Sequence, residues 1–293
     1  MPTLIMGVVV ATFTSLFWAL AATLYRKAVV DIEDPLATNW FRAPLALGFM
    51  AALSWSLGEL SEVPSLLQGG WSLAWILLAT TLAIVLGDTL YMAALRDAGV
   101  SIGYPVGYVY PLYASLFAVA LLGEEVTLGL ALGLGLALSG IWVTSFNPPR
   151  GLGDRGRILK GVTAAVAAGL CWGLGSVVYR VAVAAVDPVN VNLVKLAFLI
   201  AVTSPFAWRS RLRVGKEALG CAFLGGLMGL GLGDWLFYVC LSMIGVARAV
   251  TLTTSSPLIS IILARLLLRE RAGLRQALGA LMIVSGVTVA VWL

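Results

Sequence analysis

Four ionisable side chains stand inside long apolar stretches of the chain: Arg42, Asp88, Lys195 and Asp234. An unpaired charge at the centre of a bilayer costs at least about 2.5–3.5 kcal/mol, so a charge that is kept there indicates function. At 1.5 Å of rise per residue, Arg42 and Asp88 are expected about 10–12 Å from one membrane surface, and Lys195 and Asp234 about as far from the other. The spacing therefore predicts two ion pairs, Arg42–Asp88 and Lys195–Asp234, on opposite sides of the membrane.

Several interpretations of these pairs stay open. A pair that is joined in one state and separated in another would be a gate or part of a substrate site. A static pair would only tie two helices together, and Arg42 could instead extend its head to the lipid headgroups. Asp88 and Asp234 are also candidate sites for a coupling proton, because burial favours the neutral form of a carboxyl group.

Polar and aromatic residues at membrane depth mark a candidate cavity. Asn39 and Asn192 precede the two buried bases by one helical turn and are expected to satisfy their charged heads. Tyr104, Tyr108 and Pro111 share one helix face at i, i+4 and i+7. The predicted cavity residues are Tyr104, Tyr108, Tyr110, Thr254, Ser256, Trp18, Trp172, Asn39 and Asn192. The alternative is that the tyrosines lie in interface belts, the hydroxyls bond their own helices and the tryptophans only fill space.

Prolines interrupt two of these apolar stretches. Pro105 and Pro111 fall in one stretch, together with two glycines, and Pro257 falls in the stretch that matches it in the second half of the chain. A proline inside a helix removes one backbone hydrogen bond and clashes with the preceding turn. In a membrane the freed carbonyls need other partners. We therefore expect Pro105, Pro111 and Pro257 to act as hinges.

The composition excludes most enzymatic chemistry. The chain has no histidine, so His-based zinc sites and Ser-His or Cys-His catalysis are unavailable. Its three cysteines all sit in apolar runs and do not suggest a disulfide framework. Because the sequence shows neither a nucleophile–base pair nor a metal cluster, we expect a protein that is not an enzyme and uses no metal or cofactor.

The same composition indicates a membrane protein. Sixty per cent of the residues are hydrophobic and 11% are charged, with a mean hydropathy of +0.99, whereas soluble domains have roughly 25% charged residues. A bilayer-spanning helix needs about 20 apolar residues, and long continuous runs argue against a β-barrel. The sequence predicts an all-α membrane protein of ten transmembrane helices, at residues 4–25, 36–57, 71–95, 100–122, 126–146, 161–183, 189–207, 218–243, 247–267 and 275–293.

The basic residues of the loops divide unevenly between the two sides of the membrane. Only Arg180 and Arg248 fall on the side of the termini. The other side carries Arg26, Lys27, Arg96, Arg150, Arg155, Arg157, Lys160, Arg209, Arg211, Arg213, Lys216, Arg265, Arg269, Arg271 and Arg275. Cytoplasmic loops are rich in basic residues, so we expect a multi-pass protein of the cell membrane with both termini extracytoplasmic. The net charge of +5 is thereby explained without a nucleic-acid partner, and the first run lacks the basic start of a cleaved signal.

The two halves of the chain repeat each other, first at an offset of 154 residues, then at 153 after a one-residue gap, and later at a constant 146. Matched pairs include Trp18/Trp172, Tyr25/Tyr179, Arg26/Arg180, Asn39/Asn192, Arg42/Lys195, Gly87/Gly233, Asp88/Asp234, Pro111/Pro257 and Glu124/Glu270. The predicted units are a first repeat at 1–147, a cytoplasmic linker at 148–160 and a second repeat at 161–293. Five spans per repeat, an odd number, place the second copy upside down. Inverted repeats are typical of transporters whose substrate site lies near the midplane, where the repeats meet.

Two long stretches carry a family resemblance. GVSIGYPVGYVYPLYASLFAVALLGEEVTLGLALGLGLALSGI and its echo GVARAVTLTTSSPLISIILARLLLRERAGLRQALGALMIVSGV resemble the EamA repeat of the drug/metabolite transporter superfamily. Arg42 also matches a family feature. The resemblance covers essentially the whole chain and implies a ten-helix, inverted-repeat secondary transporter of small metabolites, often outward. One motif departs from the family, because Arg269 precedes Glu270 where a glycine is usual.

We therefore expect a secondary transporter, acting as an exporter, for a small polar or amphipathic metabolite such as an amino acid. Paired charges, amides and tyrosines suit a zwitterion. A lipid or isoprenoid-carrier flippase stays open, as does a carrier of the sugar-phosphate or nucleotide-sugar type, which the expected separation of Arg42 from Lys195 disfavours. The expected partners are a small-molecule substrate, the lipid bilayer and a coupling proton, and the chain is expected to be a monomer or a homodimer.

Overall fold

The computed structural model describes residues 2–68, 70–122, 127–146, 154–183, 186–210, 214–244, 252–270 and 272–292. Within these ranges all regular structure is helical. Two expectations lie partly outside the described residues, namely the linker at 148–160 and the start of the span at 247–267.

The first half of the chain forms nine α-helices, one 3₁₀-helical segment (η1) and one π-helical segment (η2). Their bounds are α1 Pro2–Ile32, α2 Pro35–Phe41, α3 Ala43–Leu57, η1 Glu59–Glu62, α4 Val63–Leu67, α5 Trp71–Thr80, η2 Thr81–Gly87, α6 Asp88–Ala98, α7 Val100–Gly107, α8 Tyr110–Leu122 and α9 Leu128–Phe146. The described second half contains α10 Arg155–Val183, α11 Pro188–Ser210, α12 Lys216–Gly226, η4 Leu227–Gly233, α13 Asp234–Ile244, α15 Ser256–Leu267 and α16 Leu274–Trp292.

Two expected spans of the first repeat are broken at residues of interest. Arg42 separates α2 from α3, and Pro44 at the start of α3 explains the break because it cannot donate a backbone hydrogen bond. The Asp34 side chain caps the other end of α2 by accepting the backbone N–H groups of Leu36 and Ala37. The expected span at 100–122 likewise divides into α7 and α8. Both breaks remove the regular helix next to a predicted site residue.

Two other spans contain a π-helical segment at matching places. The segment η2 ends immediately before Asp88, and η4 ends immediately before Asp234, 146 residues later. A π-turn widens the helix and frees backbone groups, and such turns often occur at functional sites. The inverted repeat therefore extends to the irregular backbone in front of each buried carboxylate.

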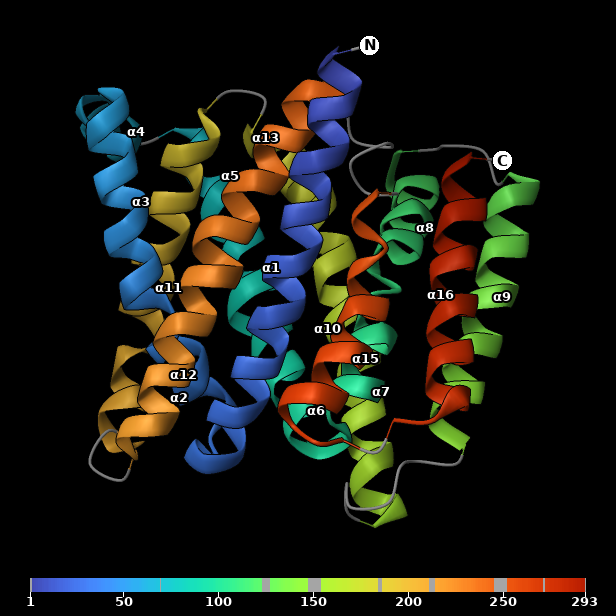
Figure 1. The fold of residues 1–293 in the computed structure, drawn as a ribbon. Helices are drawn as coiled ribbons and strands as arrows, with labels where there is room; N and C mark the ends of the chain where they lie inside the picture. Colours follow the sequence, from blue (N-terminus) through green and yellow to red (C-terminus); the bar gives the residue numbers. More distant parts are fainter. Residues whose placement is uncertain are drawn as a thin grey trace.

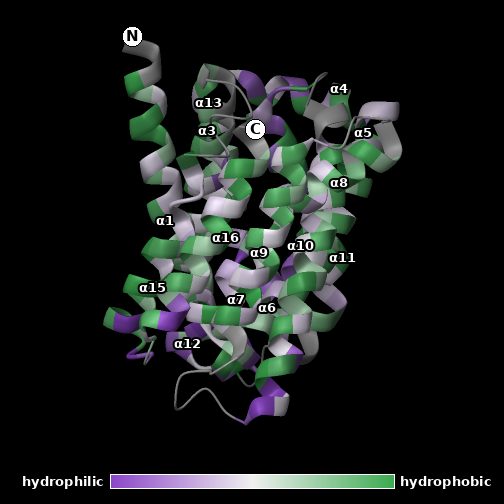
Figure 2. Ribbon diagram, turned by 90° about the vertical axis from the view of Figure 1, so that its right-hand side faces the viewer, coloured by the Kyte–Doolittle hydropathy of each residue, from purple (hydrophilic) through white to green (hydrophobic). Residues whose placement is uncertain are grey.

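The exterior of the helices is apolar at mid-height. Figure 2 shows hydrophobic residues covering the helix faces there and hydrophilic residues gathered at the end away from the termini. Five helical stretches of the described residues are long and apolar enough to cross a membrane: Ile5–Ile32, Trp71–Ala98, Arg155–Tyr179, Pro188–Ala207 and Lys216–Phe237. The other expected spans are present as helices that are broken or shorter. The chain is thus an all-α, multi-pass membrane protein.

The first helix of each repeat packs against the other repeat. In Figure 1, α1 and α10 run through the middle of the bundle, α9 and α16 lie side by side at one edge, and both termini lie at the same end. The N-terminal α1 contacts α12, η4 and α13 of the second repeat, while α10 contacts α5, η2 and α6 of the first. This exchange brings residues far apart in the sequence to the centre of the molecule.

Candidate substrate cavity

A central cavity of about 200 Å³ lies between the two repeats. Its lining contains all four of the charges that the sequence places inside apolar stretches and is otherwise dominated by aromatic rings. The lining residues are Trp18, Ala21, Tyr25, Arg42, Ala83, Ile84, Asp88, Tyr91, Tyr104, Tyr108, Tyr110, Trp172, Ser176, Tyr179, Lys195, Gly229, Leu230, Asp234 and Phe237. Across the described residues, no three metal-ligating side chains come together. The lining thus combines a few charged groups with aromatic walls, as ligand cavities do.

The first ion pair joins α2 to α6. The Arg42 guanidinium donates to the Asp88 carboxylate through Nη2, and its Nε donates to Asn39 Oδ1 at 2.8 Å. Asn39 in turn donates through Nδ2 to the carbonyl oxygen of Ile84, inside η2, at 2.8 Å. Thus one amide holds the arginine head and also satisfies a carbonyl in the π-helical segment.

The second ion pair repeats this arrangement with one difference. Lys195 Nζ donates to Asp234 Oδ2 at 2.7 Å, and Asn192 Nδ2 donates to the carbonyl oxygen of Leu230, inside η4, at 3.0 Å. The carbonyl partners Ile84 and Leu230 are themselves 146 residues apart. Among the described residues, however, Asn192 Oδ1 has no hydrogen-bond partner. Lysine has no counterpart of the arginine Nε that holds Asn39, so part of the second network stays open.

Each carboxylate also binds a tryptophan of the opposite repeat. Trp172 Nε1 donates to Asp88 Oδ1 at 2.6 Å, and Trp18 Nε1 donates to Asp234 Oδ1 at 3.0 Å. The glycines before the two aspartates make room for the indoles: a Cβ at Gly87 would lie 2.9 Å from Trp172, and one at Gly233 would lie 2.6 Å from Trp18. In each Gly-Asp pair the glycine thus leaves space for an indole from the other half of the chain, and the aspartate accepts its N–H.

The two ion pairs border one shared cavity, while their expected placement on opposite sides of the membrane stays a prediction. Arg42, Asp88, Lys195 and Asp234 all line the same space, and both pairs are joined at once. The depth argument assumed straight helices at a constant rise, but the break at Arg42 and the π-helical segments alter that geometry. The expected separation of Arg42 from Lys195 therefore no longer argues against an anionic substrate.

Aromatic rings close into a five-membered circuit along one wall. Trp172, Tyr91, Tyr104, Tyr108 and Tyr110 follow one another with neighbouring ring centroids 5.1–6.2 Å apart, and Tyr110 returns to Trp172. Tilted and edge-on pairs at such distances are favourable aromatic contacts. The circuit comes mainly from α6, α7 and α8, so the first repeat supplies most of the aromatic wall.

The predicted hydroxyl residues of the second repeat lie behind this wall. Ser256 Oγ and Tyr104 Oη share a hydrogen bond of 2.7 Å, and Tyr108 Oη donates to the carbonyl oxygen of Thr253 at 2.8 Å. Thr254 and Ser256 are buried but are not among the residues that line the cavity. In this conformation Tyr104 and Tyr108 line the space instead, and the expected role of Thr254 and Ser256 stays a prediction.

The three predicted hinge prolines all lie at or near helix breaks. Pro105 is inside α7, which ends two residues later, and Pro111 is the second residue of α8. Pro257 is the second residue of α15. Proline is well tolerated in the first turn of a helix, where its missing N–H would have no partner. These positions agree with an irregular backbone, while hinge motion at them stays a prediction.

Several lining residues were not singled out from the sequence. Tyr25, Tyr91, Tyr179 and Phe237 all border the cavity. The match of Tyr25 with Tyr179, seven residues after the two paired tryptophans, was a usable signal, since two helical turns place both residues on the same face as the indole. Tyr91 and Phe237 follow the paired aspartates by three residues and share their face in the same way.

Another contact between the repeats joins α1, the start of α7 and the segment after α15, whose ends lie opposite the termini (Figure 1). Arg26 Nη1 donates to the carbonyl oxygen of Leu95 at 2.6 Å, and its Nε lies 3.9 Å from Glu270 Oε1. The Glu270 carboxylate accepts the backbone N–H groups of Val100 and Ser101 at 2.9 and 3.0 Å. A carboxylate at the start of α7 satisfies unpaired donors and complements the helix dipole. Glu270 thereby fixes α7 to the end of α15.

Comparison with known proteins agrees with this architecture. Residues 5–146 and 159–292 each match the model of the EamA-like transporter family. A protein of Archaeoglobus fulgidus described as an uncharacterized transporter is 22% identical over 270 residues, which are 92% of each chain. A solved structure described only as a crystal structure of a protein has the same fold, with a TM-score of 0.66 at 20% identity over 97% of this chain and 96% of that one. The matches cover both repeats, and the chain belongs to the EamA-like transporter family.

Proposed function

We propose that the chain is a secondary transporter that moves a small zwitterionic or amphipathic metabolite, such as an amino acid, out of the cell by alternating access. The observation that carries the proposal is the charge balance of the cavity. Its two cations and two carboxylates pair with each other. Such a site favours a substrate whose own charges balance, because a polyanion would require cations that are not already engaged.

The aromatic circuit supports an apolar or aromatic part in the same substrate. Aromatic rings supply large contact areas at low conformational cost, and ligand cavities combine such walls with a few polar groups. Two ends of different character, the charged pairs and the tyrosine-rich wall, match the two ends of an amino acid such as leucine or phenylalanine.

The exchanged first helices support a rocking mechanism. Since α1 and α10 each pack on the opposite repeat, movement of one repeat against the other would carry Trp18 and Trp172 relative to the aspartates that they bind. In an inverted repeat, exchanging the conformations of the two halves converts one access state into the other. The ion pairs are proposed to separate in part when the substrate's own charged groups enter.

Counterflow in proteoliposomes tests the substrate class. Vesicles preloaded with unlabelled leucine, phenylalanine, glutamate, lysine or glucose 6-phosphate would each receive the labelled form of the same compound, with protein-free liposomes as the control. Leucine or phenylalanine should exchange fastest. Exchange of glucose 6-phosphate in their place would contradict the proposal. Repeating the assay with and without a pH gradient tests proton coupling at the buried carboxylates.

Direction and orientation need separate measurements. For an exporter, inside-out vesicles of producing cells should accumulate the labelled amino acid more than right-side-out vesicles do. The uneven loop charges lead us to propose extracytoplasmic termini, so a C-terminal reporter that works only in the cytoplasm should stay silent. Strong reporter activity there would reverse the proposed orientation.

A further inference from the structure

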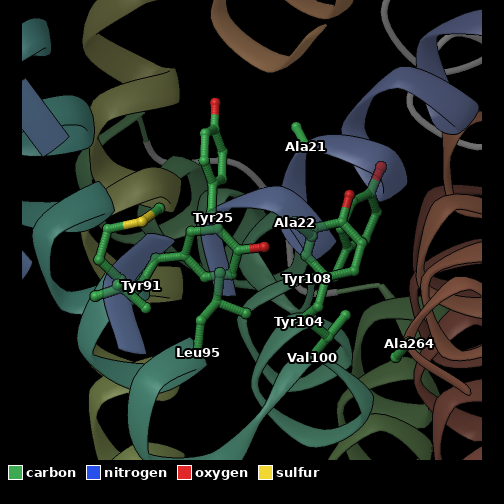
Figure 3. Close-up of a cluster of buried hydrophobic side chains, with 12 residues drawn as sticks. Ala21, Ala22, Tyr25, Tyr91, Leu95, Val100, Tyr104, Tyr108 and Ala264 are labelled. Atoms are coloured by element: carbon green, nitrogen blue, oxygen red, sulfur yellow. The ribbon is translucent and has the colours of Figure 1, made fainter. Parts of the chain in front are cut away.

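Tyr25 borders the cavity, and the described residues leave its hydroxyl donor unused. The side chain is 4% exposed, and within the described part of the chain its Oη lies beside the Arg42 guanidinium but has no acceptor for its own hydrogen. In Figure 3 its hydroxyl points away from Leu95 and Val100, out of the buried cluster. A buried hydroxyl that lacks a partner is costly to the folded protein. Its retention at the wall of a ligand cavity suggests that a bound ligand supplies the partner.

The other repeat shows what the missing partner would be. Tyr179, the counterpart of Tyr25, shares a hydrogen bond of 3.0 Å with Thr80 Oγ1. The position that matches Thr80 at the offset of 146 is Gly226, which has no side chain. A Cβ at Gly226 would overlap the carbonyl oxygen of Arg42. Close packing of α12 against the α2–α3 break therefore denies Tyr25 the hydroxyl that Tyr179 receives.

A second position, beside the Tyr25 hydroxyl, carries a smaller residue than its counterpart in the first repeat. Gly229 stands where the first repeat has Ala83, and a Cβ at Gly229 would lie 2.5 Å from Tyr25 Oη. Both Gly229 and Tyr25 line the cavity. The second repeat thus has glycines at the two positions that match Thr80 and Ala83, and neither a hydroxyl nor a methyl group stands there.

The surroundings of the hydroxyl favour an anionic oxygen. The guanidinium carbon of Arg42 lies 5.0 Å from the centroid of the Tyr25 ring, which places a cation beside the phenol. The Asp88 oxygens already accept Arg42 and Trp172, and the Asp234 oxygens already accept Lys195 and Trp18. A carboxylate that entered would therefore find an unused donor at Tyr25, while each protein carboxylate already accepts two hydrogen bonds.

We propose that the Tyr25 hydroxyl is the group that recognises the carboxylate of the transported molecule, donating its hydrogen bond to a carboxylate oxygen beside Arg42. This inference rests on the proposed transport of an amino-acid-like substrate and names the residue that binds the substrate's carboxylate. Tyr179, whose hydroxyl is held by Thr80, has no such role.

The test compares Tyr25→Phe with the matched Tyr179→Phe in proteoliposomes. Tyr25→Phe should raise the KM for phenylalanine about tenfold or more, the scale of one lost hydrogen bond to a charged group. Its thermal midpoint should stay the same or rise, because the deleted hydroxyl has no acceptor among the described residues. Tyr179→Phe should lower the midpoint, since it removes a protein hydrogen bond, and should raise the KM less than Tyr25→Phe does, because the Tyr179 hydroxyl is held by Thr80 while the ring still lines the cavity.

A competitor checks that the carboxylate is the group recognised. Wild-type protein should be inhibited far more weakly by phenylalaninamide than by unlabelled phenylalanine, and Tyr25→Phe should bring the two inhibition constants closer together. The assignment would be overturned if the ratio of the two inhibition constants were the same in wild type and in Tyr25→Phe. An unchanged KM together with a lowered thermal midpoint in Tyr25→Phe would overturn it as well. Wild-type protein that neither exchanges nor is inhibited by phenylalanine would instead contradict the proposed substrate class, and this inference with it.

Discussion

Trp172 of the second repeat donates its indole N–H to Asp88 of the first at 2.6 Å, across 84 residues of sequence. The same bond recurs with the roles of the repeats exchanged, from Trp18 to Asp234 at 3.0 Å. Together the two bonds make each carboxylate a junction between a base of its own repeat and an indole of the other. A displacement of one repeat must therefore disturb both junctions.

We predict that Trp172→Phe weakens both folding and transport. The variant keeps an aromatic ring but removes a hydrogen bond to a charged acceptor, which is worth about 1.5–3 kcal/mol. Trp18→Phe should cost less stability, because the Asp234 side chain is 18% exposed against 8% for Asp88 and water can replace the lost donor. Thermal unfolding in detergent measures the effect, and Trp55→Phe, at a site 74% exposed, is the control. Equal midpoints for all three variants would contradict the prediction.

The sequence alone predicts much of the fold because each span carries its own apolar signal. The ten spans and the repeat follow from runs of residues and from matches at fixed offsets. The broken helix at α7–α8 was also accessible, since Pro105 and Pro111 interrupt the run. These features depend on local chemistry, which a single sequence displays directly.

The arrangement of the cavity was less accessible, because it depends on contacts between distant segments. The π-helical segments read TLAIVLG and LMGLGLG, which resemble any apolar helix. The bond from Trp18 to Asp234 joins residues 216 positions apart. The free hydroxyl of Tyr25 depends on Gly226 packing against the Arg42 backbone. Spacing along one helix indicates none of these relationships.

We predict unequal effects from removing the two buried carboxylates. Asp88→Asn would leave the Arg42 guanidinium, which is 2% exposed, without its carboxylate, and breaking such a pair costs about 3–5 kcal/mol. Asp234→Asn should lower the free energy of unfolding by less, because Asp234 is more exposed. Both variants should lose most transport activity. If the carboxylates bind a coupling proton, each variant should instead keep exchange while losing its dependence on a pH gradient.

Side-specific labelling should locate the cavity. In a background without Cys171, Cys221 and Cys240, Tyr110→Cys should react with a polar thiol reagent, and substrate should slow the reaction. Thr254→Cys should react much more slowly, because Thr254 is buried outside the lining. The comparison is a rate measured on membranes of equal protein content. Faster labelling at Thr254 than at Tyr110 would place the water-accessible space behind the tyrosine wall.

We predict that Glu270→Gln loosens the end of the bundle opposite the termini. The carboxylate accepts two backbone N–H groups at the start of α7 and faces Arg26, whereas one amide oxygen replaces only part of this. The loss should be about 1–3 kcal/mol in the free energy of unfolding. Glu217→Gln is the control, since the Lys27–Glu217 pair is exposed to solvent and should contribute little. A midpoint in Glu270→Gln no lower than that of the control would argue against the capping role.

Stability should also depend on pH through Glu59, which lies in η1 outside the spans. Partial burial, followed by the charge and hydrogen bond of Asp187, raises the pKa of Glu59 above its usual value. Below the raised pKa the protonated Glu59 can bond Asp187, and as the pH rises through it the two carboxylates repel each other. The folded state then holds more protons than the unfolded one, so this contribution weakens with rising pH. Glu59→Gln should therefore raise the thermal midpoint at neutral pH and flatten its fall between about pH 4 and 7. Glu62→Gln is the control, because Glu62 contributes least to the raised pKa of Glu59, and it should keep most of the dependence of the midpoint on pH. If the midpoint of Glu59→Gln depended on pH as steeply as that of the wild type, the prediction would be refuted.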